Sequence, residues 1–366
     1  MPKEPPLSTP ALPLAGIRVL DLTRLLPGPV ATLRLAEMGA DVLKIEEPGD
    51  GDYARAIGPA RCEVSQFFVA VNRGKRLLRL DLKDAAGRDA LLALVDTADV
   101  LVESFRPGVM DRLGLGWQDL KSRNRRLVMC AISGYGATGP MAHLAGHDIN
   151  YTGLAGMLAQ NAGPDGRPVL PNLQVGDLLG GAQSAVQGIL AALVAVKCGG
   201  MGSFVDVSMT DAVFAHNIMP LVAHNNGQAA PPGRDLLTGG VPCYNVYRTL
   251  DGRWMAVGAL ELKFWQGCCA VLGRPDLAGR HWQLGQRVGG DDALAVQAEL
   301  DALFATRTQA QWCTLFDGVD CCVTPVLDTT QALAHSLFHA RGMVERFVHS
   351  TEGESLLPAA PVRFTA

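Results

Sequence analysis

The chain has 366 residues, of which 48% are hydrophobic and 19% charged, so it has the apolar surface for large cores in about two domains. Its 32 basic and 36 acidic residues give a formal net charge of −4 without a basic block, which excludes an electrostatic footprint for nucleic acid. Its 41 glycines cluster between apolar segments, as is typical of a backbone that a ligand must approach closely.

The first third of the chain alternates between strand and helix patterns. A strand at 17–22, a helix from Pro27 to Met38 and a strand at 40–46 make one parallel βαβ unit. The alternation continues with a strand at 75–81, a helix at 85–94, a strand at 100–104, a helix at 108–120 and a strand at 127–133. Together these elements predict a doubly wound parallel sheet of the α/β class.

The pattern changes after Leu173. We expect a long helix of small residues at 178–197, and we interpret it as buried because polar residues and glycines interrupt it. A strand at 204–208, a helix at 209–224 and a Gly/Pro-rich passage at 227–242 follow.

The last third predicts a smaller α+β domain. Asp251-Gly252 marks the turn of a hairpin between 244–249 and 254–259, and helices are expected at 262–273, 292–305 and 308–317. The expected organisation is a large domain of residues 1–200 plus 328–366, a linker at 201–242, and a small domain at 243–327.

The nine cysteines contain no CxxC spacing, and two of their pairs are adjacent in sequence. Adjacent cysteines do not readily form a disulfide or a tetrahedral zinc site. We expect reduced, buried thiols in a cytoplasmic protein.

Residues 134–139 match G-x-G-x-x-G after a predicted strand. Pro140 and a polar segment follow instead of a helix, so the match is a poor dinucleotide fingerprint. His143 and His147 have helical spacing for a metal, but no third ligand is near in sequence, whereas catalytic zinc needs three.

Three acidic positions and one arginine permit both a structural and a functional interpretation. Asp148 suits a helix cap or a working base beside His147. Asp177, just before a predicted helix, suits an N-cap and also a carboxylate stabilised there, with Gly180 leaving room for a ligand. Glu261 at a strand end suits ordinary surface or a site. Arg106, after a predicted strand, suits an anion in the crevice or a solvated loop.

Several ordered segments together resemble the family III CoA-transferases of the CaiB/BaiF type, over about residues 14–345. The segments are 14–23, 27–29, 35–46, 103–109, 113–115 and 133–136. Within that group, residues 146–151, Asp177 and 247–261 resemble the branch of α-methylacyl-CoA racemases. Leu178, Leu179 and Cys243 depart from that branch, which is expected to reshape the acyl pocket.

The resemblance implies His147, Asp177 and Glu261 as catalytic residues, with Glu261 orienting His147. It implies Lys44 and Arg106 as residues that bind CoA phosphates or hold the site, and it suggests Tyr151 as a residue of the acyl pocket. The remaining expected contacts with CoA or substrate are Gly134, Tyr135, Gly136 and Gly180.

The resemblance further implies an interlocked homodimer, whereas the charge balance and the interrupted apolar helix predict neither a nucleic-acid nor a membrane partner. It implies no metal and no organic cofactor, since coenzyme A is part of the substrate. The expected reaction is racemisation of 2-methylacyl-CoA thioesters through an enolate, with Asp177 on one face and His147 with Glu261 on the other.

Two alternatives remain open. In a CoA-transferase, Asp177 would attack the thioester and form an anhydride and then an aspartyl-CoA thioester, without need of His147 or Glu261. A non-catalytic CoA-binding protein is the third possibility, and the presence of all three candidate groups argues against it.

Overall fold

The computed structural model describes residues 12–163 and 165–365, so residues 1–11 of the expected large domain lie outside the described part. The chain divides into two compact units. The first contains residues up to Met157, Pro171–His216 and the tail from Leu337, and the second contains Leu158–Leu170 and Asn217–Ser336. The second unit is therefore inserted between segments of the first.

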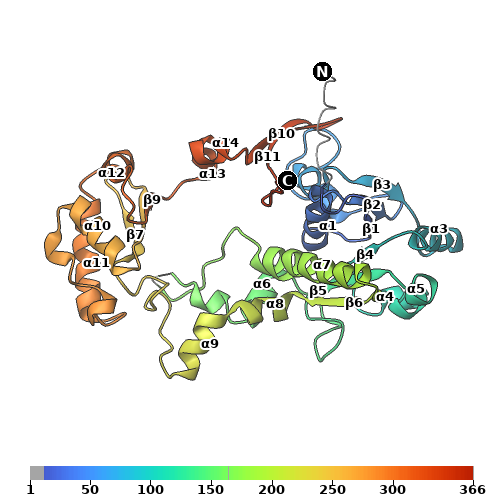
Figure 1. The fold of residues 1–366 in the computed structure, drawn as a ribbon, viewed down its shortest axis with the longest axis horizontal. Coiled ribbons are helices and arrows are strands. Elements are labelled where there is room, and N and C mark those ends of the chain that lie inside the picture. Colours follow the sequence, from blue (N-terminus) through green and yellow to red (C-terminus); the bar gives the residue numbers. More distant parts are fainter. Residues whose placement is uncertain (1–11, 164, 366) are drawn as a thin grey trace, which may run out of the picture. The chain divides into compact units, whose positions relative to one another are not determined.

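The first unit is built on a six-stranded parallel sheet, with strand order β3-β2-β1-β4-β5-β6 (Figure 1). This order confirms the doubly wound α/β prediction and places the topological switch point between β1 and β4. The strands are β1 (Arg18–Asp21), β2 (Asp41–Glu46), β3 (Arg76–Arg79), β4 (Val100–Glu103), β5 (Val128–Ser133) and β6 (Phe204–Ser208).

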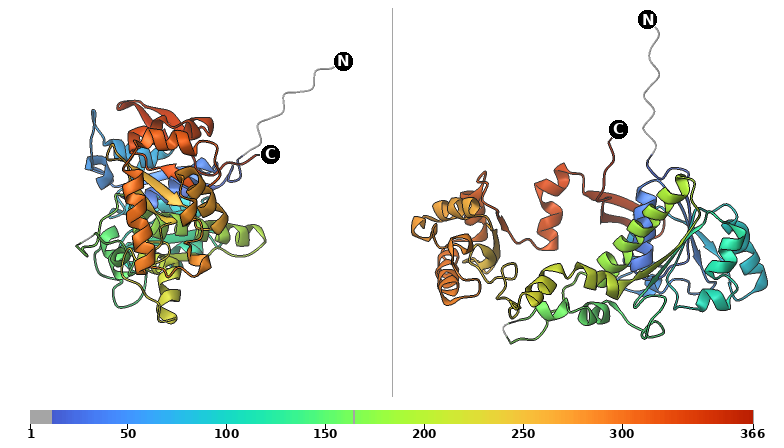
Figure 2. Two further views of the ribbon diagram at one scale, coloured as in Figure 1. Left: turned by 90° about the vertical axis from the view of Figure 1, so that its left-hand side faces the viewer. Right: turned by 60° about the horizontal axis from the view of Figure 1, so that its bottom comes forward.

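Helices cover both faces of this sheet (Figure 2). Side chains alternate along each strand, so Val100 and Val102 enter one core whereas Leu101 enters the other. The first face packs against α1 (Pro27–Glu37), α2 (Gln66–Asn72) and α7 (Ser184–Lys197). The second face packs against α3 (Ala85–Val95), α4 (Val109–Arg112) and α5 (Trp117–Arg123).

Two expected helices of this unit have different bounds in the structure. The helix expected at 108–120 is interrupted between α4 and α5, where Gly114 takes a φ of 70° that favours glycine. The helix expected at 178–197 begins earlier, as a π-helical segment at Gly176–Gln183 that continues directly into α7. The continuous helix Gly176–Lys197 is long and apolar enough to cross a bilayer, but half of its most apolar window is buried inside the protein.

The structure also changes the expected domain boundaries. Strand β6 and helix α8 (Met209–His216) complete the first unit, although they fall within the linker expected at 201–242. The chain returns to this unit with α14 (Ser336–Ala340) and a hairpin of β10 (Val344–His349) and β11 (Gly353–Pro358). In the hairpin turn, Glu352 accepts hydrogen bonds from the backbone N–H groups of residues 61–64, which lower the pKa of its carboxyl to about 2.

The second unit is the smaller α+β domain. Its antiparallel sheet has the order β7-β8-β9 and joins β7 (Tyr244–Arg248), β8 (Trp254–Gly258) and β9 (Val323–Pro325). A buried aromatic core containing Trp265, Phe304 and Trp312 lies between this sheet and its helices. The helices that contribute to this core are α10 (Leu262–Leu272), α11 (Asp291–Phe304) and α12 (Gln309–Phe316). The unit also contains α9 (Ile218–Asn225) and α13 (Thr329–Ala334), which have no buried residue.

Two ion pairs are buried in the first unit. Lys75 Nζ lies 3.0 Å from Asp21 Oδ2, and Lys44 Nζ lies 2.9 Å from Asp52 Oδ2. Burial raises the pKa of Asp21, but the charge of Lys75, followed by that of Lys44 and two threonine hydroxyl donors, outweighs it and holds the pKa well below its usual range. The Asp21 carboxylate is therefore charged at neutral pH, and its partners offset the free-energy cost of burying that charge.

We predict that Asp21→Asn lowers the free energy of unfolding at pH 7 by roughly 3–5 kcal/mol, because it leaves the buried Lys75 charge without its carboxylate partner. The matched control is Asp41→Asn, which removes an exposed pair with Arg76 and should cost at most about 1 kcal/mol. Urea unfolding monitored by circular dichroism measures both changes. Equal losses in the two variants would contradict this interpretation of the buried pair.

Candidate active site

Chain topology brings several helix N-termini to the carboxyl edge of the parallel sheet. Helix α1 begins where the chain leaves β1, and α7 must end near the start of β6 because it leads into that strand. The N-terminus of the π-helical segment therefore lies near the carboxyl ends of β5 and β6, the edge at which open α/β sheets bind ligands.

Asp177 lies in the first turn of the π-helical segment. Val175 is the N-cap, so the expectation that Asp177 caps this helix is wrong, and its carboxyl remains available. Glycines fix the segment against its neighbours: a Cβ at Gly180 would lie 2.7 Å from the Met209 carbonyl oxygen, and one at Gly181 would lie 2.7 Å from Pro27 Cβ. π-Helical turns are frequent at functional sites.

His147 and Asp177 are linked through Asp148. Helix α6 (Asp148–Leu154) begins with His147, not Asp148, as its N-cap, and the Asn150 side chain accepts a hydrogen bond from the His147 backbone N–H. Asp148 Oδ1 instead accepts a hydrogen bond of 3.0 Å from the Asp177 backbone N–H. The His147 side chain is exposed, and the residue that follows it, Asp148, is hydrogen-bonded to the backbone of Asp177.

Burial and the same contact together set the pKa of Asp177. Burial, followed by the charge of Asp148, raises the pKa of the Asp177 carboxyl from 3.8 to about 7. A carboxyl with this pKa exchanges protons readily at neutral pH, as general acid–base catalysis requires.

The glycine loop at 134–139 lies against Tyr151. The Tyr151 ring packs edge-on against Tyr135 with centroids 5.4 Å apart, and its hydroxyl donates to the Gly146 carbonyl. A Cβ at Gly134 would lie 2.5 Å from this ring. Because Tyr151 is only 5% exposed, its position favours support of the loop over a place in the acyl pocket.

The loop itself fits the interpretation made from sequence. Gly136 adopts a φ of +86°, which favours glycine. The loop is followed by turns and extended chain up to His147, without the helix of a dinucleotide fingerprint.

A crevice of about 390 Å³ opens beside the carboxyl ends of β1–β4. In it the Arg24 guanidinium lies 5.2 Å from the ring centroid of Tyr53 and 5.4 Å from that of Phe105. Arg24 also pairs with Glu47 at 3.1 Å, and Lys83, which lines the same crevice, lies 3.8 Å from the other oxygen of the Glu47 carboxylate. Sequence reasoning missed these residues, although Arg24 and Phe105 each follow a predicted strand.

Arg106 follows Phe105 directly and is exposed, but it does not line this crevice. Its side chain is open to solvent at the same edge of the sheet, so both interpretations made from sequence still apply to it.

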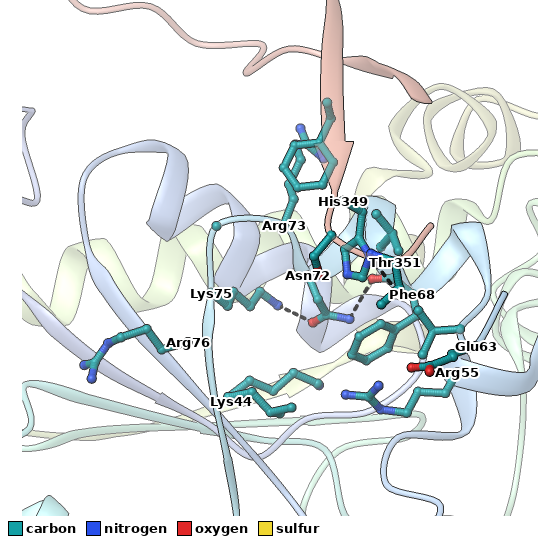
Figure 3. Close-up of a pocket in the computed structure, with 16 residues that line it drawn as sticks. Lys44, Arg55, Glu63, Phe68, Asn72, Arg73, Lys75, Arg76, His349 and Thr351 are labelled. Atoms are coloured by element: carbon teal, nitrogen blue, oxygen red, sulfur yellow. Dashed lines mark hydrogen bonds between the residues drawn. The ribbon is translucent and has the colours of Figure 1, made fainter. Parts of the chain in front are cut away.

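Lys44 has a different environment from Arg106. It is 1% exposed, pairs with Asp52 and donates to the Thr23 carbonyl oxygen at 2.9 Å, which favours a role in holding the site over contact with a CoA phosphate. It borders a second cavity of about 390 Å³ that also contains Lys75, hydrogen-bonded to Asn72 (Figure 3). The lysines of this cavity, Lys44 and Lys75, are held in buried ion pairs, unlike Arg24 and Lys83 in the crevice, which disfavours it as a phosphate site. All five Lys and Arg residues that line it pair with carboxylates: Lys44, Arg55, Arg73, Lys75 and Arg76.

Glu261 belongs to the second unit, whereas His147 and Asp177 belong to the first. It follows β8 and is the N-cap of α10, with an exposed side chain that makes no capping hydrogen bond. Of the residues that depart from the racemase pattern, Cys243 is buried in the core of the second unit, Leu178 packs against a core of the first unit, and Leu179 is 36% exposed.

Comparison with known proteins shows relatives along almost the whole chain. The model of CoA-transferase family III matches residues 14–366. The chain is 35% identical to human alpha-methylacyl-CoA racemase, over 95% of this chain and 86% of that protein. It is 31% identical to mouse succinyl-CoA:glutarate CoA-transferase, over 96% of this chain and 81% of that protein. The solved structure of Rv3272 from Mycobacterium tuberculosis is similar, with a TM-score of 0.82, 31% identity, and coverage of 98% of this chain and 94% of that one.

We predict that Asp148→Asn lowers the pKa of Asp177, because asparagine keeps an oxygen for the Asp177 N–H but removes the like charge. Carbon-13 NMR of aspartate-labelled protein can follow the titration, with Asp177→Asn identifying the signal. Asp211→Asn on the neighbouring helix α8 is the control and should leave the titration unchanged. An unchanged Asp177 pKa in Asp148→Asn would show that burial alone sets it.

Proposed function

We propose α-methylacyl-CoA racemase activity for this chain, which belongs to CoA-transferase family III. The observation that carries the proposal is Asp177: a partly buried carboxyl with a pKa raised to about 7, tied through Asp148 to the start of the helix that follows His147. The 35% identity to human alpha-methylacyl-CoA racemase supports it.

The reaction needs two groups that exchange protons on opposite faces of the substrate. One base removes the α-proton, and the electron pair of the C–H bond moves into a planar enolate. An acid on the other face then returns a proton to the α-carbon, which inverts it. A single base would return the proton to the face from which it came, so retention would follow.

Asp177 serves as one of these groups and His147 as the other. The pKa of Asp177 near neutrality lets it act as base on one enantiomer and as acid on the other. Glu261 orients the imidazole and stabilises its cation. The dipoles at the N-termini of α6 and the π-helical segment stabilise the developing charge on the thioester oxygen, while the Asp177 N–H itself stays bonded to Asp148.

The crevice containing Arg24, Tyr53 and Phe105 is the proposed place for the nucleotide part of coenzyme A. Aromatic faces suit the adenine ring, and Arg24 and Lys83 supply positive charge for phosphates, which would replace their partly exposed partner Glu47. The remaining acyl-pantetheine arm then follows the same edge of the sheet toward Asp177. The reaction we propose needs neither a metal nor an organic cofactor, and we place it in the cytoplasm.

We further propose that the protein acts as a homodimer. Each unit leaves large apolar side chains exposed, including Phe214 at 52% in the first unit and Ile218 at 61% and Met219 at 51% in the second. Such side chains suit a protein–protein interface.

CoA transfer is the second candidate function, and the similarity to mouse succinyl-CoA:glutarate CoA-transferase favours it. In that reaction the Asp177 carboxylate attacks the thioester carbonyl, and CoA leaves as thiolate. The thiolate then attacks the Asp177 carbonyl of the mixed anhydride, releasing the first acid. A second carboxylate repeats these steps in reverse and leaves with CoA.

Deuterium exchange separates the two functions. Incubation of a chiral 2-methylacyl-CoA in D₂O should give α-deuterium and loss of optical purity, both followed by NMR and chiral analysis. Glu261→Gln should lower the exchange rate by about 10²-fold, within the range for general acid–base groups. The exposed Glu345→Gln is its matched control and should retain the wild-type rate.

Transfer of CoA to an added carboxylic acid without α-exchange, together with a CoA adduct on Asp177 in the mass spectrum, would overturn the racemase proposal. It would instead establish the second candidate function.

The raised pKa of Asp177 predicts opposite pH limbs for the two enantiomers. For the enantiomer from which Asp177 removes the proton, kcat/KM should fall as pH drops through about 7, because the carboxyl becomes protonated. For the other enantiomer, Asp177 must donate, so kcat/KM should fall as pH rises through the same value. Initial rates for the separate enantiomers test this, and limbs of the same direction would contradict the assignment.

A further inference from the structure

Glu261 depends on its backbone for its position. Its carboxylate makes no hydrogen bond to α10, although the residue is the N-cap of that helix, and its side chain is exposed. Its own carbonyl oxygen accepts from the Phe264 and Trp265 N–H groups in the first turn of α10. The direction in which the carboxylate leaves the chain is therefore set by the peptide groups on either side of it.

Both flanking residues are held by one short segment, 281–283. The Trp282 indole N–H donates to the Leu260 carbonyl oxygen at 2.8 Å. The Gln283 side-chain oxygen accepts from the Leu262 N–H at 2.9 Å. Leu260 and Leu262 immediately precede and follow Glu261, so the two bonds fix the chain before and after the carboxylate-bearing residue.

His281 anchors this segment in the core of the second unit. Its ring is fully buried, with centroids 6.5 Å from Trp265 and 5.8 Å from Trp282. Its Nδ1 accepts from the Gln283 N–H at 3.2 Å and caps the short helix Trp282–Leu284. Since a nitrogen that accepts a hydrogen bond carries no proton, the ring has its proton on Nε2. Burial lowers the pKa of His281, which keeps this neutral form.

Helix α10, which begins directly after Glu261, is anchored in the same core. The Trp265 indole N–H, in α10, donates to the Leu277 carbonyl oxygen at 2.9 Å, and Trp265 is fully buried. The segment 281–283 and the first turn of α10 are thus joined through the same aromatic core. The Gln283 bond also satisfies the N–H of Leu262, the first residue of α10, which has no partner within the helix, whereas the Trp282 bond to Leu260 lies before the helix.

We propose that the segment 281–283 is a positioning clamp for Glu261, with Trp282 and Gln283 as positioning residues and His281 as their anchor. The inference rests on the proposed function, since it takes Glu261 as the partner of the His147 imidazole. An unsupported exposed glutamate samples many rotamers and backbone positions. The clamp removes the backbone part of that freedom, and misplacement of a catalytic group by about 1 Å can cost about 10²-fold in rate.

The test is a double-mutant cycle on α-deuterium exchange. Trp282→Phe keeps the aromatic ring and removes the N–H that binds Leu260, and Gln283→Ala removes the acceptor for Leu262. We expect each to lower kcat about tenfold with little change in KM. Gln283→Glu keeps an acceptor oxygen and should restore most of the rate. Trp254→Phe and Gln266→Ala, at exposed positions of the same unit, are the matched controls and should leave kcat unchanged.

The decisive comparison uses Glu261→Gln as background. If the clamp acts through the Glu261 carboxylate, Trp282→Phe should cause no further loss there, since residues that act as one unit give non-additive effects. Thermal unfolding of each variant shows whether it folds, and Gln283→Ala gives a second route if Trp282→Phe does not.

An equal loss from Trp282→Phe in the wild-type and Glu261→Gln backgrounds would overturn the clamp and leave the racemase proposal intact. So would wild-type kcat in both Trp282→Phe and Gln283→Ala. Full exchange in Glu261→Gln alone would overturn the role of Glu261, and the clamp with it.

Discussion

The hydrogen bond from the Asp177 backbone N–H to Asp148 Oδ1 joins the parts on which the candidate site depends. It ties the start of the π-helical segment to the start of α6, and it holds a second carboxylate near Asp177. Burial raises the pKa of Asp177 most, and the Asp148 charge held by this contact adds to it, which brings the pKa to about 7. The contact therefore fixes the position of the proposed catalytic group and contributes to its protonation behaviour.

The fold places this contact at the edge where ligands bind in open α/β sheets. The strands are parallel, so each connection returns the chain to the same edge of the sheet. The carboxyl ends of all six strands therefore lie together at the opposite edge. Strands β4 and β5 could be predicted from sequence because each is an almost uninterrupted run of apolar residues. Such runs are typical of parallel strands whose two faces are both covered, as they are here. The close packing of the π-helical segment could not, since the neighbours of Gly180 and Gly181, Met209 and Pro27, lie in other segments of the chain.

The limits of sequence reasoning at the site have a physical basis. His147, Asp177 and Glu261 could be chosen by resemblance. From the residues alone the roles of Asp148 and Asp177 stay open, because aspartate serves both as a helix N-cap and as a catalytic base. For Lys44 the resemblance left open a phosphate ligand or a residue that holds the site, and the structure favours the second, because Asp52, eight residues later, compensates its charge in the interior. The stacking of Arg24 between Tyr53 and Phe105 joins three distant segments and leaves no periodic signal.

The most direct test of the account is face-resolved α-exchange in Asp177→Asn, measured in D₂O by NMR on each 2-methylacyl-CoA enantiomer separately. If Asp177 is one of two bases, the variant should lose racemisation yet still exchange the α-proton of one enantiomer, with retention, through His147. The other enantiomer should not exchange. Racemisation at the wild-type rate, or equal exchange of both enantiomers, would contradict the claim that Asp177 exchanges the proton on one face.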